Sequence, residues 1–357
     1  MNDEAPAHLL DYDLDALTDW AKQHDLPAYR VRQILEWVLV HNANTFDEMS
    51  NLPKRLREEL AAIFTIYTST IATEQRSDDG TVKLLLRWPD GLTSECVLLP
   101  ETDRNTACLS SQVGCPVQCA FCASGIDGIQ RQLTTGEIVE QMLRVRALCA
   151  PGERLSNIVF MGIGEPLANY DAVLAAVRTA NAPWGLNISA RKITISTVGI
   201  PERIRRLADD APPVTLAISL HATTDTLRQE LIPWARRVSI AELTEAARYY
   251  FDRTGREITL EYLMLGSVNM RSLDVERLAR LAQRLRCNVN LIAYNPVADL
   301  GFERPGHAAV QGFLRDLREH GVNAHVRRSR GLDIDAACGQ LRRRDRIEPI
   351  DTMEVQI

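Results

Sequence analysis

The sequence predicts an α/β fold in which a partial barrel of parallel strands follows an N-terminal helical region and a small β meander. From about residue 105, apolar strand-like runs alternate with helical stretches, a pattern that produces right-handed βαβ units and a parallel sheet. Six or so such units are too few for a closed barrel of eight. We therefore predict a partial (β/α)6-type barrel.

Residues 1–63 have the pattern of a helical accessory domain. Pro27 and Pro53 mark two helix starts, because proline is tolerated in the first helical turn. Apolar residues then recur at helical spacing, so one face of the helix is predicted to pack into the core. These positions are Val31, Ile34, Leu35, Val38 and Leu39.

Residues 64–103 are rich in strand-forming residues. The turn sequences Asp78-Asp79-Gly80 and Pro89-Asp90-Gly91 separate the apolar runs 66–71, 82–88 and 93–99. A three-stranded meander that carries Glu95 is the simplest prediction.

Residues 104–345 are expected to form the barrel, with a C-terminal loop that carries Cys338 and a tail over 346–357. Strands are predicted over 107–113, 157–161, 192–197, 214–220, 257–263, 288–294 and 324–328. Helices are predicted between them, for example over 135–148, 170–181, 239–252 and 273–285. Active sites of parallel barrels form where the strands end.

Composition indicates a cytoplasmic protein with no membrane segment. The acidic N-terminus has no export signal, and no run approaches the roughly 18 apolar residues that span a bilayer. The net charge of −6 disfavours a nucleic-acid partner only weakly, because the basic residues cluster and several clusters together favour a polyanion. The clusters are Arg30 and Arg32; Lys54, Arg55 and Arg57; Arg203, Arg205 and Arg206; Arg327, Arg328 and Arg330; Arg342, Arg343, Arg344 and Arg346.

Three cysteines in one short stretch carry the strongest chemical signal. Cys115, Cys119 and Cys122 are spaced C-x3-C-x2-C, with Phe121 before the last. Three thiolates can hold three irons of a [4Fe-4S] cluster, one cluster per chain, and leave the fourth iron open to a small molecule. Structural zinc normally uses four ligands in two pairs, and no second pair is present. Zinc and three ordinary thiols remain as alternatives.

This cysteine motif resembles the signature of radical S-adenosylmethionine (SAM) enzymes, whose open iron is chelated by the methionine part of SAM. Gly164-Glu165-Pro166, after a predicted strand, resembles the family motif that binds the amino group of SAM. The resemblance implies further SAM contacts at other strand ends. These positions are Ser196, Ser219, Leu220, His221 and Asn295.

Two other motifs resemble the methyl-synthase branch of this family, and specifically its RlmN-type members, which methylate carbon 2 of adenosine in RNA. They are 333–341, with Cys338, and 106–115, with Cys108. Carbon 2 is not a nucleophile, so radical chemistry supplied by the cofactor is needed there. The resemblance implies that Cys338 is methylated by one SAM while a second SAM is cleaved to a radical. A covalent enzyme–RNA adduct then forms, Glu95 acts as base, and Cys108 releases the product and leaves a disulfide with Cys338.

The resemblance covers nearly the whole chain, including the helical domain over 1–63, which it implies contacts RNA. It also implies partners. They are 23S ribosomal RNA in the peptidyl-transferase region, an anticodon-loop adenosine of tRNA, and a reductant such as flavodoxin; the protein is expected to be a monomer. Cys96, Cys149 and Cys287 match no catalytic position and are expected to be ordinary thiols.

Three other functions remain as alternatives. Cfr-type sister enzymes methylate carbon 8 of adenosine and confer antibiotic resistance, but Pro166 and Ser329-Arg330-Gly331 favour carbon 2. The others are a non-methylating radical SAM enzyme, such as a glycyl-radical activator, and a zinc-bearing RNA-binding protein without catalysis.

Overall fold

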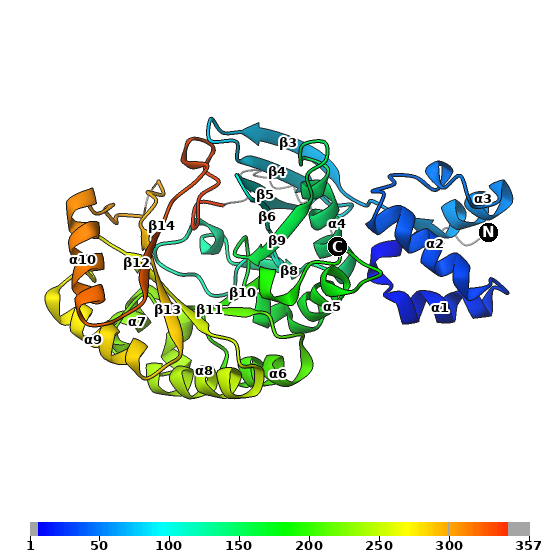
Figure 1. Cartoon of the computed structure of the whole chain (residues 1–357). Coiled ribbons are helices and arrows are strands. Elements are labelled where there is room, and N and C mark those ends of the chain that lie inside the picture. Colours follow the sequence, from blue (N-terminus) through cyan, green and yellow to red (C-terminus); the bar gives the residue numbers. More distant parts are fainter. Residues whose placement is uncertain (1–5, 299, 342–357) are drawn as a thin grey trace, which may run out of the picture.

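The computed structural model describes residues 6–298 and 300–341, and it confirms the predicted α/β partial barrel (Figure 1). Within these residues, one curved sheet has the strand order β14-β13-β12-β11-β10-β9-β6-β5-β4-β3. Helices cover the outer face of its parallel part (Figure 1). The Arg342–Arg346 cluster and the tail over 346–357 lie outside the described residues. None of the described helices is long and apolar enough to span a bilayer.

The N-terminal region forms helices α1 (Leu14–Gln23), α2 (Ala28–Leu39) and α3 (Lys54–Ile63). Pro27 and Pro53 immediately precede α2 and α3, as predicted. The expected apolar positions of α2 are buried. The short strands β1 (Ala7–His8) and β2 (Phe64–Thr65) pair in parallel, so the two ends of this region are held together.

The parallel part of the sheet begins at β6 (Arg104–Cys108) and ends at β14 (Ala324–Arg327). Between them lie β9 (Leu155–Phe160), β10 (Ile193–Thr197), β11 (Thr215–Ser219), β12 (Ile258–Met264) and β13 (Cys287–Ala293). The outer helices are α4 (Thr135–Arg146), α5 (Tyr170–Asn181), α6 (Pro201–Asp210), α7 (Asp225–Leu231), α8 (Ile240–Thr254), α9 (Ser272–Gln283) and α10 (His307–Glu319). The carboxyl ends of the parallel strands therefore share one edge of the barrel.

The meander is present, and it continues the barrel sheet. Strands β3 (Thr70–Arg76), β4 (Val82–Arg87) and β5 (Thr93–Glu101) are antiparallel, and β5 pairs with β6. The predicted strand over 66–71 is wrong, because β3 begins at Thr70. The main-chain N–H groups of Thr68 and Ser69 instead donate to the buried Glu140 carboxylate at 2.8 and 3.0 Å.

The predicted strand over 107–113 is also wrong, since two strands occur there. β6 ends at Cys108, and β7 (Gln112–Gly114) pairs separately with β8 (Ile129–Gln132). The chain turns between them because the Ser110 N–H donates to Gln141 Oε1 at 2.9 Å and the Ser110 hydroxyl donates to the Glu95 carbonyl at 2.5 Å. This turn directs the chain from the sheet into the cysteine loop.

Candidate active site

The cysteine loop, Cys115–Cys122, starts directly after β7 and is held by main-chain hydrogen bonds. The Cys115 N–H donates to the Gly128 carbonyl at 2.9 Å, and the Ala120 N–H donates to the Leu231 carbonyl at 2.9 Å. Gly114 precedes the loop with φ +77°, and a Cβ there would lie 1.9 Å from the Gly128 oxygen. Only glycine therefore permits this entry into the loop.

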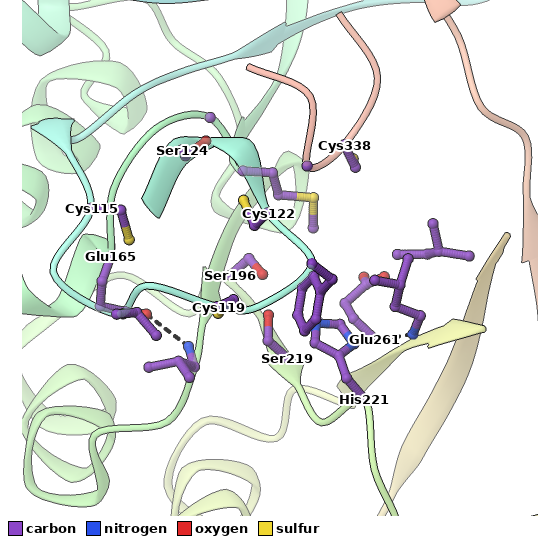
Figure 2. A pocket seen from close by; sticks show the side chains of 18 of the residues that line it. Cys115, Cys119, Cys122, Ser124, Glu165, Ser196, Ser219, His221, Glu261 and Cys338 are labelled. Atoms are coloured by element: carbon purple, nitrogen blue, oxygen red, sulfur yellow. Dashed lines mark hydrogen bonds between the residues drawn. The ribbon is translucent and has the colours of Figure 1, made fainter. Parts of the chain in front are cut away.

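All three cysteines of the loop line one cavity of about 160 Å³ at the carboxyl ends of the strands (Figure 2). Burial raises the pKa of Cys115 to about 12, and it also raises the pKa values of Cys119 and Cys122. The three thiols are therefore neutral unless a cation stabilises their thiolates. Among the described residues, no three His, Cys, Asp or Glu side chains are arranged to hold a single metal ion. In a four-iron cluster each thiolate has its own iron, so the sulfurs need not converge on one point.

A buried cation beside this loop fits a negatively charged group at the cysteines. Arg228 of α7 is fully buried, and its Nη1 has no hydrogen-bond partner. The strongest electrostatic attraction on the guanidinium comes from Cys119 as a thiolate. The cysteine donor set together with this unpaired cation fits an iron–sulfur cluster.

Glu165 follows β9 and lines the same cavity (Figure 2). Its carboxylate accepts hydrogen bonds from the Thr197 hydroxyl at 2.7 Å and from the N–H groups of Val198 and Leu167 at 2.7 and 2.9 Å. Burial raises the pKa of Glu165, although these bonds act in the opposite direction. Gly164 lies beside it in the cavity lining. The bonds fix the carboxylate at the end of the second parallel strand.

Ser196, Ser219 and His221 also face this cavity, from the ends of β10 and β11 (Figure 2). Burial lowers the pKa of His221 to about 3, so its ring is neutral at neutral pH. The Leu263 N–H donates to His221 Nδ1 at 3.1 Å, and the ring meets Phe121 edge to face. Leu220 is buried and does not line the cavity.

The loop that carries Cys338 lies directly on the cysteine loop. The Ala123 N–H donates to the Gly339 carbonyl at 2.8 Å, and the Ser124 hydroxyl donates to the Leu341 carbonyl at 2.8 Å. Asn295 donates from its side-chain amide to the Cys338 carbonyl at 3.1 Å. In this structure Asn295 therefore supports the Cys338 loop; its predicted contact with SAM stays a prediction.

A second and larger cavity, of about 680 Å³, occupies the interior of the barrel. Cys108 and Cys338 both line it, which brings together the two cysteines that the sequence motifs singled out. The two cavities meet at a few shared side chains. These are Met161, Glu261, Ile292, Arg327 and Cys338.

All eight cysteines are free in this structure, so a disulfide between Cys108 and Cys338 is not supported. Burial raises the pKa of Cys108 to about 12, which keeps this thiol neutral. The two free thiols lie in the lining of one cavity.

Glu95 does not line either cavity. It lies on β5 and is 4 % exposed, with Oε1 3.0 Å from the Lys83 ammonium of β4. Lys83 also donates to the Asp335 carbonyl at 3.3 Å, so one cation joins Glu95 to the Cys338 loop. The structure thus places the predicted base next to this loop, outside the lining of both cavities.

The turn between β3 and β4, far away in sequence, forms hydrogen bonds with the loop that carries Cys338. The Asp79 carboxylate accepts from the Gly331 N–H at 3.1 Å, and the Ser77 hydroxyl donates to Asp333 at 2.6 Å. Arg330 donates to the Asp79 carbonyl at 2.7 Å. We call these contacts between the Ser77–Thr81 turn and residues 330–333 the latch.

Sequence reasoning missed Lys83, Arg228, Glu261 and the latch. Glu261 is 3 % exposed, lines both cavities and has one carboxylate oxygen without a partner. A signal was present, since Glu261 interrupts the apolar run 258–264 and Lys83 interrupts 82–86. Polar residues inside buried strands are uncommon unless they are paired or functional.

Comparisons with known proteins identify the family of this chain. The model of the radical SAM superfamily matches residues 109–282, and that of the ribosomal RNA large subunit methyltransferase N-terminal domain matches residues 7–66. A probable dual-specificity RNA methyltransferase RlmN from Rhodopirellula baltica is 46% identical over 94% of this chain and 91% of its own length. Its counterpart in Geobacillus kaustophilus is 45% identical over 94% and 92%.

A solved structure extends the likeness to three dimensions. A radical SAM methyltransferase from Sphaerobacter thermophilus has a TM-score of 0.92 and 44% identity, covering 94% of this chain and 99% of that chain. A zinc-bearing protein without catalysis and a non-methylating radical SAM enzyme are thereby set aside. The chain belongs to the RlmN family of radical SAM RNA methyltransferases.

Proposed function

We propose that this enzyme methylates carbon 2 of one adenosine in the peptidyl-transferase region of 23S ribosomal RNA and of an anticodon-loop adenosine in tRNA. The observation that carries the proposal is the position of Cys338 between two cavities. One cavity contains the cysteine triad, and the other is large enough for a nucleoside and contains Cys108. A carbon carried on the Cys338 sulfur can meet reactants from both sides.

When bound, a [4Fe-4S] cluster at Cys115, Cys119 and Cys122 and SAM supply the methyl group and the one-electron chemistry, with two SAM consumed per turnover. Glu165, with Gly164, would hold the methionine amino group. Ser196, Ser219 and His221, which line the same cavity, would hold the rest of SAM, and Leu220 and Asn295 would contribute from outside its lining. Glu165, Leu220, His221 and Asn295 are buried, which supports the proposal because burial excludes water that would quench a radical.

The protein side chains then perform the remaining steps. Cys338 accepts a methyl group on its sulfur, since a thiolate is a competent nucleophile. That carbon bonds to carbon 2 of adenine, which joins the RNA covalently to Cys338. Glu95 takes the proton from carbon 2. The Cys108 thiolate then forms a sulfur–sulfur bond with Cys338 while the carbon–sulfur bond breaks; the electron pair of that bond stays on the carbon, which takes a proton and becomes the methyl group. The one electron left from the radical addition would return to the one-electron cofactor, and an external thiol reduces the sulfur–sulfur bond.

RNA is recognised by charge around the second cavity. Its lining includes the cations Arg104, Arg191, Lys192, Arg327, Arg328 and Arg330. An adenosine that is flipped out of the RNA base stack needs a pocket for its base and cations that bind the neighbouring phosphates. Arg104 and Arg330 are also paired, with Glu101 and Asp79. Lys54 and Arg55 in α3 are paired with Glu58 and Glu59, as expected for a solvated helix face, and they lie outside the cavity lining.

Carbon 8 is the alternative target, as in Cfr-type enzymes. Pro166 and Ser329-Arg330-Gly331 support carbon 2, and both lie at the site: Pro166 follows Glu165, and Ser329 donates to Asn295 at 2.7 Å. A flavodoxin-like reductant and a monomeric enzyme complete the proposal.

The test is mass spectrometry of ribosomal RNA and tRNA from a deletion strain. We expect 2-methyladenosine to disappear, to return with the wild-type gene, and to stay absent with Cys338→Ala. Cys287→Ala is the matched control, because that thiol lies outside both cavities, and it should restore methylation. Loss of 8-methyladenosine in place of 2-methyladenosine would assign the enzyme to carbon 8, and methylation restored by Cys338→Ala would overturn the proposed route.

A further inference from the structure

Arg228 is a buried cation that the protein itself does not neutralise. It is fully buried, and burial lowers its pKa to about 10, so the guanidinium remains charged at neutral pH. Within the described residues, no ion pair shorter than 4.0 Å involves Arg228. Asp225, the nearby carboxylate of the same helix, instead accepts from the Ile240 N–H at 2.7 Å. Such an uncompensated charge is costly in a protein interior.

The hydrogen bonds of Arg228 fix the guanidinium at the strand ends. Nη2 donates to the carbonyls of Val198 and Ser219 at 2.5 and 3.3 Å, and Nε donates to the Leu220 carbonyl at 3.3 Å. Nη1 has no partner. These contacts account for the orientation of the side chain, and main-chain dipoles supply only part of the compensation that a full charge needs.

The negative charge that would balance Arg228 can be supplied at the cysteine triad. Cys119 is the cysteine that interacts most strongly with Arg228, and the Ala120 N–H next to it donates to Leu231 at the end of α7. Arg228 therefore belongs to the helix that supports the cysteine loop. A thiolate-bound iron–sulfur cluster is negatively charged, and reduction adds one more negative charge.

We propose that Arg228 is the fixed countercharge of the cluster, which stabilises the loaded site and raises the reduction potential of the cluster. The inference rests on the proposed function only in requiring a cluster at the triad. Arg228 acts as a positioning and charge-compensating residue and touches neither RNA nor Cys338. Cluster potentials are set by net charge and nearby hydrogen bonds, so a fixed cation favours the reduced state.

The experiment uses the full chain, reconstituted anaerobically with iron and sulfide, without RNA or SAM. Iron content, the midpoint potential by electron paramagnetic resonance, and the Tm of apo and loaded forms are measured for wild type, Arg228→Gln and Arg228→Lys. Arg146→Gln is the matched control. Arg146 is half-buried and, like Arg228, donates to main-chain carbonyls, those of Leu39 and Val40, but it lies on α4 away from the triad.

We expect Arg228→Gln to lower the ratio of reduced to oxidised cluster at a fixed potential at least tenfold, about 59 mV for one electron. The gain in Tm on cluster loading should also shrink. Arg228→Lys keeps the charge and should retain most of both effects, and Arg146→Gln should match wild type after loading.

A wild-type potential and a wild-type gain in Tm for Arg228→Gln would overturn the inference, as would an equal shift in Arg146→Gln. If Arg228→Gln does not fold, Arg228→Lys decides: retention of the potential supports the countercharge, and its loss overturns it. A wild-type chain that takes up no iron would instead contradict the proposed function itself.

Discussion

The two loops that meet at the active site are built in different ways. The three thiols of the cysteine loop lie within one short stretch of sequence, and the loop is fixed by the nearby Gly128 at Cys115 and by the distant Leu231 at Ala120. The Cys338 loop is assembled from afar. Its contacts come from the Ser77–Thr81 turn, from Lys83 and from Asn295.

This difference assigns the meander a role beyond that of a linker. The β4 strand and the turn before it hold a loop about 250 residues further along the chain, and β5 carries Glu95 on the same sheet. A rigid cysteine loop suits a permanently bound cluster. The Cys338 loop is held by a few polar contacts. Such a loop suits Cys338, which must present its sulfur first to one cavity and then to the other.

The largest effect on this arrangement is expected from Lys83→Met. Lys83 and Glu95 are both 5 % exposed as side chains, and breaking such a buried pair costs about 3–5 kcal/mol. Urea unfolding should show this loss. Lys54→Met, which removes an exposed lysine paired at 3.7 Å, should cause no measurable change.

The double variant Lys83→Met, Glu95→Gln tests whether the loss comes from the pair. Removing both charges should recover much of the stability, because an uncompensated buried charge is the main cost. Equal unfolding midpoints for the single and double variants would contradict this origin of the effect.

The second effect is expected from Gly331→Ala. Gly331 has φ +63°, and a Cβ would lie 2.8 Å from Ala336 Cβ and 2.9 Å from Thr81 Cγ2, so it would push the Cys338 loop off the Ser77–Thr81 turn. The left-handed backbone alone costs about 1–2 kcal/mol. Alkylation of Cys338 by iodoacetamide, followed by peptide mass spectrometry, should become faster as the loop opens.

Gly321→Ala is a control that separates the cost of the left-handed backbone from the steric clash expected at Gly331. Gly321 has φ +75°, and no atom lies within 4 Å of the position that an added Cβ would take, so this variant keeps the backbone cost and lacks the contact. It should lower stability without changing alkylation of Cys338. The latch would be the wrong explanation if the two variants changed the alkylation rate equally.

The sequence predicted the local loop and not the assembled one. The spacing of Cys115, Cys119 and Cys122 is a local pattern, and strand periodicity put Glu165, Ser196 and Ser219 at one edge of the sheet, where the structure has them. Lys83 interrupts an apolar run, but nothing in that run indicated its partner, and Asp79 gave no signal, because the roles of both depend on residues distant in sequence. Asp79 looked like an ordinary turn residue, and nothing in its neighbourhood indicated Gly331.

The smallest effect is expected from Asp79→Asn, and it should depend on pH. Burial alone would raise the pKa of Asp79, but hydrogen bonds from Thr81, Gly331 and Ser77 outweigh it and lower the pKa to about 2. A depressed carboxyl pKa contributes stability that is complete above the unfolded value of about 3.9 and is lost as the pH falls toward the folded value. The stability difference between wild type and Asp79→Asn should therefore be constant from about pH 7 to 5 and smaller at about pH 3.

Glu242→Gln provides the control for this last variant. Hydrogen bonds from Ser239 lower the pKa of Glu242 at the start of α8, so its loss should show the same direction of pH dependence. Only Asp79→Asn should also speed alkylation of Cys338 at neutral pH, because only Asp79 contacts the Cys338 loop. An Asp79→Asn enzyme with unchanged alkylation would show that Ser77 and Lys83 hold the loop without the Asp79 carboxylate.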